Sequence, residues 1–501
     1  MKVKNGIGKA VMLALFSLSL ASCGNPFERD PTHVDEQSLG KDVSGEVLAF
    51  YKARQWRAAW NDDSEKQLIE IINGAPSQGM KRELFLKAQL PKDKSEREIA
   101  LTKAALRYAS ALAQGYSDPK AISKVYTVPR AKMDVAGGLA RALGEENGLK
   151  DWYASLPPQT DDYRALAQAF ARYATLNDVQ GHLSDGKALK PGGTDPRIPA
   201  LAKALVANGY LDGEPGESRL YSPAMVTAVK ALQAEYGIKP DGIVGEGTIA
   251  ILNRGPGDRA RQIAVNMERL RWLERNPPET RIDVNTGAAT LEYWRNGSLR
   301  DKRNVVVGQP DWETPQLGSP IVQLVAHPYW RVPKSILEDE LIKKSPADLA
   351  EQGLEWRDDR LVQLPGPKNA LGEVKFDMVN DQSIYLHDTP AKALFGLPER
   401  HRSHGCVRVE GALDFAMLLA SDDGVLIPFQ EALLKFDQEG FVKLRKDVPV
   451  RLMYLTAFLD DGQVRLVDDV YGWDDDVAYA LGYVRRPPRA KVKREGGDVG
   501  P

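Results

Sequence analysis

The hydrophobic pattern of this chain changes its period near residue 280, and this change constrains the fold more than any other feature. Over residues 46–190 apolar side chains recur every three or four positions, which is typical of amphipathic α-helices. From Arg281 to Asn285 polar and apolar residues alternate instead, and Asn296-Gly297 is a strong hairpin-turn signal. We therefore expect a multidomain α plus β protein, with an α-helical scaffold domain at 46–190 and a β-rich domain at 281–475.

Length and charge narrow the class of protein. The chain has 501 residues, which at roughly 150 residues per domain suggests about three domains. Its 43% hydrophobic and 27% charged residues are ordinary for a globular protein. Lysine and arginine number 67 against 69 acidic residues, so the formal net charge is −2 and no broad positive field attracts a nucleic-acid backbone. We expect no nucleic-acid partner.

The first residues indicate export. A lysine-containing start precedes an apolar run, Ala10 to Ala21, which is short for a bilayer span and typical of a signal peptide over residues 1–22. The run ends in Leu20-Ala21-Ser22-Cys23-Gly24, which resembles the bacterial lipobox and implies a lipid on Cys23. An ordinary cleavage site with an incidental cysteine is the alternative. Residues 23–45 are then a polar tether, and the glycine after Cys23 favours a periplasmic protein anchored in the outer membrane through this lipid.

Residues 196–254 form a small helical unit with a glycine-rich turn. Two amphipathic helices are expected before the run Asp241-Gly242-Ile243-Val244-Gly245, and a third after it. This arrangement resembles the peptidoglycan-binding type 1 module, which implies a shallow groove for cell-wall glycan or stem peptide and no catalysis. A generic three-helix bundle is the alternative. Residues 255–280 are expected to form a connecting helix.

A single thiol remains if Cys23 carries lipid, because the only other cysteine is Cys406. An unpaired thiol in an oxidising compartment needs a reason such as burial or nucleophilic chemistry. A free thiol, with a pKa near 8.5, is mostly protonated at neutral pH and needs a base before it can attack. His387 ends an expected strand and fits this role. We expect the fold to bring Cys406 and His387 together.

The surroundings of this pair suggest how a substrate is held. Gly405 leaves room for a carbonyl group, and the amides of Gly405 and Cys406 are candidate oxyanion donors. A helix expected from Ala412 onward would favour the thiolate through its N-terminal end. The excursion at 328–380 is expected to be a lid, with Trp330 either over the substrate or simply packed.

Two segments, Tyr385-Leu386-His387-Asp388-Thr389 and Ser403-His404-Gly405-Cys406-Val407-Arg408, resemble the catalytic motif of the L,D-transpeptidase family in its long, multidomain Gram-negative type. The family pattern is a histidine, a loop, and then Ser-x-Gly-Cys-Val-Arg, with His404 here in the variable place. The resemblance covers about residues 46–475. His327 is a departure, because this type more often carries asparagine there.

The resemblance implies a reaction. Cys406 would attack the carbonyl that joins the third residue of a tetrapeptide stem to its terminal D-Ala, and a thioester would replace D-Ala. An amine of a neighbouring stem would then take the acyl group, which forms a 3→3 cross-link in peptidoglycan. His387 would act as base and then as acid. No metal and no cofactor take part, and the partners are peptidoglycan stem peptides and glycan.

The same resemblance assigns supporting roles. Asp388 would orient the imidazole of His387 through its backbone carbonyl. Tyr385 and Arg408 would position the donor stem. Ser403 and His404 would shape the loop around the thiol.

Several alternatives stay open. A hydrolase of the same fold would resolve the thioester with water and would trim stems or release wall-linked proteins. A catalytically inactive lipoprotein would only anchor the wall. Cys406 as an inert buried thiol, or as a zinc ligand with His387, His401 and His404, are further alternatives. A papain-like peptidase predicts Cys before His, the reverse of the order here. The basic tail at 485–501 is expected to be disordered.

Overall fold

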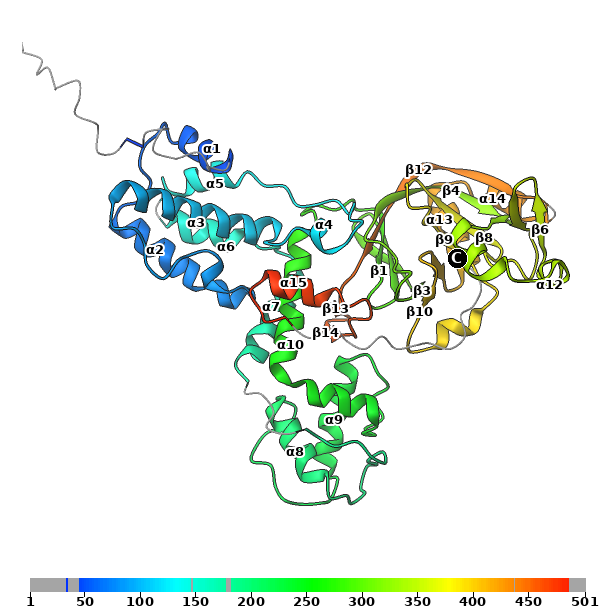
Figure 1. Ribbon diagram of the computed structural model, residues 1–501, viewed down its shortest axis with the longest axis horizontal. Helices are drawn as coiled ribbons and strands as arrows, with labels where there is room; N and C mark the ends of the chain where they lie inside the picture. The colour runs from blue at the N-terminus through cyan, green and yellow to red at the C-terminus, as the bar shows by residue number, and fades with distance from the viewer. Residues whose placement is uncertain (1–32, 35–44, 146, 177–181, 437, 486–501) are drawn as a thin grey trace, which may run out of the picture.

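The computed structural model describes residues 33–34, 45–145, 147–176, 182–436 and 438–485. The predicted signal peptide, Cys23 and all but the first residue of the predicted tail lie outside these ranges. Figure 1 shows three lobes: a helical lobe, a β-rich lobe at the opposite end, and a smaller helical lobe that projects from the middle. The predicted multidomain α plus β fold is confirmed. Within the described ranges, no helix has the length and apolar character needed to cross a membrane.

The first lobe is a scaffold of capped helices around one apolar core. At the start of its longest helix, Asp93 accepts hydrogen bonds from the amides of Ser95 and Glu96, which satisfies donors that a helix start leaves open. The helices of this lobe are α1 (Gly45–Ala53), α2 (Asp62–Asn73), α3 (Lys94–Gln114), α4 (Pro119–Ile122), α5 (Val135–Ala142) and α6 (Gly148–Ser155), with short 3-10 turns at Ala75–Gln78 and Arg82–Leu84.

Two residues of the predicted tether lie against the scaffold lobe. The amide of Val34 donates to the carbonyl of Trp56 at 2.8 Å, and the Val34 side chain is buried. His33 forms an antiparallel bridge with Arg57. The polar composition of residues 23–45 did not predict this contact. A single apolar side chain is enough to dock an extended segment, and one such residue barely changes the composition.

The small helical lobe joins the predicted wall-binding module to α7 (Asp161–Ala174). The sequence placed α7 in the scaffold domain, but its apolar face packs into the core of the small lobe. The other helices here are α8 (Ile198–Ala207), α9 (Pro223–Glu235) and α10 (Glu246–Trp272). The expected third helix of the module and the expected connecting helix are both α10, with a kink at Gly255, whose φ of 73° is left-handed, just before Pro256.

Buried charges on α10 link the lobes. Arg269 bonds to Asp474 at 2.5 Å, and Arg271 bonds to Glu268 at 3.1 Å. Glu268 also accepts a hydrogen bond from the amide of Ser117 in the scaffold lobe at 2.7 Å. Buried charges are costly without such partners, so these contacts hold the scaffold lobe and α15 to the central helix α10.

A curled nine-stranded sheet forms the β-rich lobe. Its order is β10-β3-β11-β9-β8-β4-β12-β1-β2, and β2 also pairs with β3, so the sheet closes on itself. Helices α13 (Ala412–Asp423) and α14 (Leu426–Leu433) complete its core. The strands are β1 (Arg281–Asn285), β2 (Thr290–Arg295), β3 (Ser298–Gly308), β4 (Gly318–Ala326), β8 (Val374–Met378), β9 (Leu386–His387), β10 (His401–Ser403), β11 (Val407–Val409) and β12 (Gly440–Met453). A 3-10 turn at Lys392–Gly396 follows β9.

The insertion forms a small lid with its own sheet and core. Its order is β5-β7-β6, and its apolar core packs against Tyr385 of the main domain. The predicted lid ran to residue 380, whereas Val374–Met378 is β8, a central strand of the main sheet, so the lid is residues 328–373. Its elements are β5 (Trp330–Arg331), α11 (Lys334–Ile336), a π-helix at Leu337–Leu341, α12 (Pro346–Glu351), β6 (Leu354–Arg357) and β7 (Arg360–Gln363).

His327 sits at the entrance to the lid in an uncommon conformation. Its φ is 47°, in the left-handed region where asparagine, aspartate and histidine are enriched among non-glycine residues, so histidine can take the place of asparagine here. Its Nε2 lies 2.9 Å from the carbonyl oxygen of Leu433, which holds the strained residue in place. The departure from asparagine at this position is therefore local to the base of the lid.

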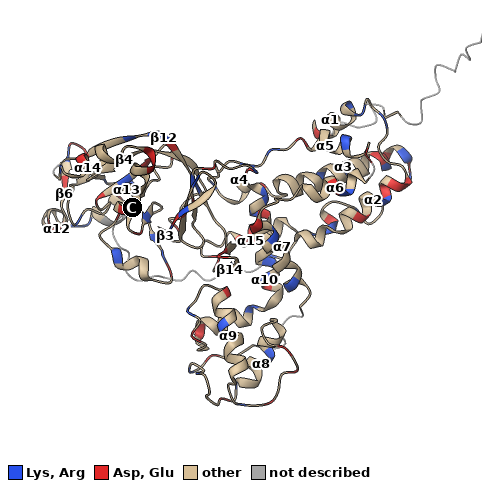
Figure 2. Cartoon of the chain, turned by 180° about the vertical axis from the view of Figure 1, so that it is seen from behind, with Lys and Arg blue, Asp and Glu red and all other residues tan. Residues whose placement is uncertain are grey.

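The last described segment leaves the β-rich lobe. The hairpin of β13 (Ala457–Asp460) and β14 (Gln463–Leu466) packs on the small helical lobe, and α15 (Asp474–Ala480) enters the scaffold core. The sequence placed all residues to 475 in the β-rich domain, whereas the packing joins this segment to the helical lobes. Figure 2 shows acidic and basic residues mixed over all three lobes, in keeping with the small net charge.

Candidate active site

Two neighbouring strands bring the predicted cysteine and histidine segments together. β9 and β11 run parallel, with Leu386 opposite Val407 and His387 opposite Arg408. Side chains alternate across a sheet, so Leu386 and Val407 point into the apolar core, and both are fully buried. Cys406 immediately precedes β11. The structure therefore places Cys406, Arg408, Tyr385 and His387 on the same face of the sheet.

The thiol of Cys406 is buried and held by Tyr385. The Sγ atom lies 3.7 Å from the carbonyl oxygen of Ser383, and the amide and hydroxyl of Tyr385 both hydrogen-bond to the sulfur. Cys406 is 5% exposed. Burial raises the pKa of the Cys406 thiol to about 11, although the bonds from Tyr385 and the positive charges of Lys375 and Arg408 act in the opposite direction. The resting group is a thiol, not a thiolate.

The expected help from a helix end is not present at this site. α13 begins at Ala412, beyond the whole of β11, whereas Cys406 precedes that strand. The favourable effect of a helix N-terminus is confined to its first turn. Burial therefore keeps the Cys406 thiol protonated, whereas the sequence-based expectation was that a helix end favours the thiolate.

His387 is oriented by its own neighbour. Its Nδ1 lies 2.5 Å from the backbone oxygen of Asp388, and a carbonyl can only accept, so Nδ1 carries the proton. In the neutral ring, Nε2 then holds the lone pair of a base. The His387 ring contacts Tyr385 edge-on, with 5.6 Å between centroids. The Asp388 carboxylate pairs with Lys392 and accepts the amide of Glu373 at 3.0 Å, which fastens the end of the lid to the site.

Residues 403–406 form the Cys loop, and internal hydrogen bonds define its shape. Ser403 Oγ donates to the carbonyl of Cys406 at 2.6 Å and accepts the amide of Gly405 at 3.2 Å. Gly405 has a φ of 110°, which L side chains rarely adopt. In this conformation the Gly405 amide is engaged by Ser403, so its expected role as an oxyanion donor stays a prediction.

Thr314 and Tyr471 support the Cys loop from behind, and sequence reasoning did not assign them this role. Thr314 Oγ1 donates to the carbonyl of Gly405 at 2.8 Å and accepts the amide of Gly308 at 2.8 Å. Tyr471 accepts the amide of Thr314 at 3.3 Å and donates to the carbonyl of Gly308 at 2.7 Å. Tyr471 lies 65 positions beyond Cys406 in the numbering of the chain, and no sequence signal links the two.

The remaining candidates occupy different surroundings. His404 packs edge-on against Trp312, with 4.9 Å between ring centroids. Arg408 is buried beside the sulfur, and Trp330 lies in the small core of the lid. The ring of His401 is held at both ends, with Nδ1 2.6 Å from Glu399 and Nε2 2.8 Å from the carbonyl of Thr286. The catalytic roles of the candidate residues stay predictions.

Lys375 is a further component of the site, and it was not among the residues predicted from the sequence. Its Nζ lies 4.4 Å from the centre of the Tyr385 ring and 2.5 Å from Asp377. It is opposite His387 in the pairing of β8 with β9. The alternating pattern of residues 374–378 contained a strand signal, but these residues were assigned to the lid. The positive charge of Lys375 acts to lower the pKa of the Cys406 thiol, against the effect of burial.

The fold and the site define a multidomain protein whose curled β-domain carries a buried cysteine and a histidine on neighbouring strands, on the same face of the sheet. Residues 279–427 match the L,D-transpeptidase catalytic domain, residues 194–252 match a family described as "Putative peptidoglycan binding domain", and residues 45–170 match a scaffold domain. The chain thus carries an L,D-transpeptidase catalytic domain together with a peptidoglycan-binding type 1 module.

Relatives cover parts of the chain. A Haemophilus influenzae protein named "Putative L,D-transpeptidase" is 31% identical over 244 residues, which are 44% of this chain and 49% of that protein. The N-acetylmuramoyl-L-alanine amidase CwlL of Bacillus licheniformis is 39% identical over 74 residues, 15% of this chain and 21% of the amidase. The chain therefore spans about half the length of the first relative and about a fifth of the second.

Solved structures of L,D-transpeptidases are similar at low identity. The enzyme from Xylanimonas cellulosilytica is 16% identical, with a TM-score of 0.18, over 54% of this chain and 98% of that chain. A mutant Enterococcus faecium L,D-transpeptidase is 13% identical, with a TM-score of 0.20, over 36% of this chain and 52% of that chain.

Proposed function

We propose that this protein is a peptidoglycan-modifying L,D-transpeptidase that forms 3→3 cross-links through a thioester on Cys406. The observation that carries the proposal is the pairing of β9 with β11, which brings Cys406, Tyr385 and His387 to one face of the sheet. The family match of residues 279–427 supports the class of reaction. The match of residues 194–252 supports peptidoglycan as the polymer.

The buried thiol determines how the reaction begins. With a pKa of about 11, the thiol of Cys406 is protonated at neutral pH, so its proton leaves as the sulfur attacks. Nε2 of His387 takes that proton while a bond forms between the sulfur and the carbonyl carbon of the third stem residue. The carbonyl oxygen becomes an oxyanion, and backbone amides of the Cys loop are the hydrogen-bond donors that would stabilise it.

Collapse of this intermediate completes the acyl transfer. The bond to the terminal D-Ala breaks, and the nitrogen of D-Ala receives the proton from His387. A side-chain amine of a neighbouring stem then attacks the thioester, the new amide forms, and the sulfur of Cys406 leaves and regains a proton. Arg408 and Tyr385 position the donor, because a guanidinium suits a stem carboxylate and the Tyr385 hydroxyl already lies at the sulfur.

The test incubates the purified chain with tetrapeptide-containing wall fragments, in parallel with Cys406→Ala and His387→Gln. We expect 3→3 dimers and free D-Ala from the unaltered chain and neither product from Cys406→Ala. Shortened or released monomers without dimers would instead identify the hydrolase. Mass spectrometry after exposure to a carbapenem locates the acyl group. No adduct on Cys406 and no product would leave only the wall-anchoring lipoprotein.

We also propose that a lipid on Cys23 anchors the protein in the periplasm, at the outer membrane. The lipobox-like sequence around Cys23 supports this, and Cys23 lies outside the described residues. Labelled fatty acid supplied to expressing cells should enter the unaltered chain and not Cys23→Ala, and the variant should leave the membrane fraction. Equal labelling of both would contradict the anchor.

A further inference from the structure

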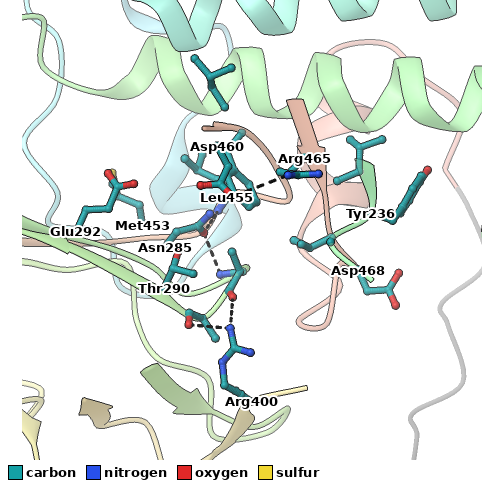
Figure 3. A pocket seen from close by; sticks show the side chains of 18 of the residues that line it. Tyr236, Asn285, Thr290, Glu292, Arg400, Met453, Leu455, Asp460, Arg465 and Asp468 are labelled. Carbon is teal, nitrogen blue, oxygen red and sulfur yellow. Dashed lines mark hydrogen bonds and ion pairs between the residues drawn. The ribbon is translucent and has the colours of Figure 1, made fainter. Parts of the chain in front are cut away.

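A cavity of about 690 Å³ lies where the wall-binding module meets the β-rich lobe. Residues 236–240, which follow α9, form one side, β1 and β2 form another, and the β13–β14 hairpin forms a third (Figure 3). Neither Cys406 nor His387 lines this cavity. Its volume falls in the range of roughly 300–1,000 Å³ typical of small-ligand sites. It is therefore a candidate binding site separate from the thiol.

The charges around the cavity balance and largely neutralise one another. Six acidic and six basic side chains line it. Asp460 pairs with Lys302 and lies 3.8 Å from Arg465. Figure 3 shows Asp460 and Arg465 facing each other on the hairpin. Arg451 bonds to Asp283 at 2.7 Å. A strongly charged ligand therefore meets no unopposed field here, whereas an uncharged ligand with many polar groups finds donors and acceptors on every side.

The cavity also offers aromatic surface beside its polar groups. Phe458 of β13 lines it and is half-buried. Trp294 of β2 also lines it, with the guanidinium of Arg281 4.8 Å from the centre of its ring, so Phe458 is the aromatic side chain that a ligand can reach. The guanidinium of Arg400, labelled in Figure 3, also lines the cavity and donates to the carbonyls of Ala288 and Ala289 at 3.1 and 3.2 Å. Sugar rings combine hydroxyl groups with C–H faces that pack on aromatic side chains. This lining therefore suits a carbohydrate.

The geometry points to a binding site for the uncharged amino-sugar chain of peptidoglycan in this cavity. The inference rests on the proposed function, which names peptidoglycan as the polymer. It adds the place where the glycan chain of that polymer binds. Stem peptides of the same polymer carry free carboxylates and amines, so the balanced charges favour glycan over stem. Residues 398–401 of the cavity wall lead directly into the Cys loop. A glycan bound here lies between the module that recruits the wall and the strand that carries the loop.

The experiment measures binding without chemistry. Cys406→Ala protein of full length is titrated by calorimetry with chitotetraose, the β-1,4 tetramer of N-acetylglucosamine, and separately with a synthetic tetrapeptide stem. The same titrations use two double variants, in which Cys406→Ala is combined with Phe458→Ala or with Phe441→Ala. Phe441 is 58% exposed on β12 and does not line the cavity, so it is the matched control. Thermal unfolding without ligand verifies that each protein is folded.

We expect chitotetraose to bind, Phe458→Ala to weaken its binding on the order of tenfold, and Phe441→Ala to leave it unchanged. No binding of chitotetraose, or equal affinity in the Phe458→Ala protein, would overturn the inference. So would a Phe458-dependent site that takes the tetrapeptide and not the sugar. Failure of the proposed function has a different readout, which is the absence of an adduct on Cys406 in the unaltered chain.

Discussion

The hydroxyl of Thr314 offers a sharp test of how the Cys loop is held. It bridges the amide of Gly308 and the carbonyl of Gly405, each at 2.8 Å. Thr314 is 0% exposed, and Gly308 and Gly405 are both buried, so neither backbone group can turn to water when the hydroxyl is lost. Thr314→Val keeps the shape of the side chain and removes both hydrogen bonds. Thr314→Ser keeps the hydroxyl and removes one methyl group.

The magnitude follows from these two contacts. A buried backbone group left without a partner costs about 1–3 kcal/mol, so two such groups predict a loss of ~2–6 kcal/mol in the free energy of unfolding for Thr314→Val. The serine variant should lose only about 1 kcal/mol, because a single buried methyl group is removed. The difference between the two variants therefore isolates the hydrogen bonds.

Two measurements check this prediction. Urea unfolding followed by circular dichroism gives the free energy of unfolding, and mass spectrometry gives the rate at which a carbapenem acylates Cys406. Misplacement of a reacting group costs rate steeply, so we expect acylation at least about tenfold slower in Thr314→Val and near normal in Thr314→Ser. A valine variant as stable as the serine variant, with unchanged acylation, would refute the idea that Thr314 positions the loop.

Three further predictions concern the thiol and the buried charges. Tyr385→Phe removes a hydrogen bond that lowers the pKa of Cys406, so the pH profile of thiol alkylation should shift upward from about 11, and an unchanged profile would contradict this contact. Arg269→Leu leaves the Asp474 carboxylate buried without its charged partner and should lower the free energy of unfolding, measured in urea, by about 3–5 kcal/mol. A loss smaller than that of a variant in an exposed ion pair would contradict the stabilising role of this buried pair. Burial and the charge of Asp474 raise the pKa of Asp469 from 3.8 to about 6, so the folded state binds this proton more tightly than the unfolded state. The protonated carboxyl group therefore adds to the free energy of unfolding at low pH, and this contribution is lost as the pH rises through about 6. Asp469→Asn should flatten this loss in unfolding measured across that pH range, and an equally steep curve would contradict it.

The chemistry-bearing segments were visible in the sequence because their signals are local. A cysteine followed by an apolar helical pattern, and a histidine at the end of an alternating run, need only a short window of residues. The repeat of apolar residues likewise marked the helical lobes and the β-rich lobe. The edge of the lid was misjudged, because Val374–Met378 follows a long irregular stretch and a five-residue central strand carries little periodic signal.

The supports of the site could not be read in this way. Tyr471 reaches the Cys loop only because the chain after β12 turns back past it, and Lys375 approaches Tyr385 only through the pairing of β8 with β9. The state of the thiol depends on burial by the surrounding core, and no local pattern reports how deeply a side chain is covered.

By itself, the sequence determined which segments are helical or extended and where a cysteine and a histidine stand as candidates for chemistry, since hydrophobic period and side-chain type are properties of neighbouring residues. Only the tertiary structure decided that the thiol rests protonated, that Thr314 and Tyr471 hold its loop, and that a cavity opens beside the wall-binding module. Each of these depends on contacts between segments far apart in the chain, and burial and hydrogen bonding across such distances follow from packing rather than from order along the backbone.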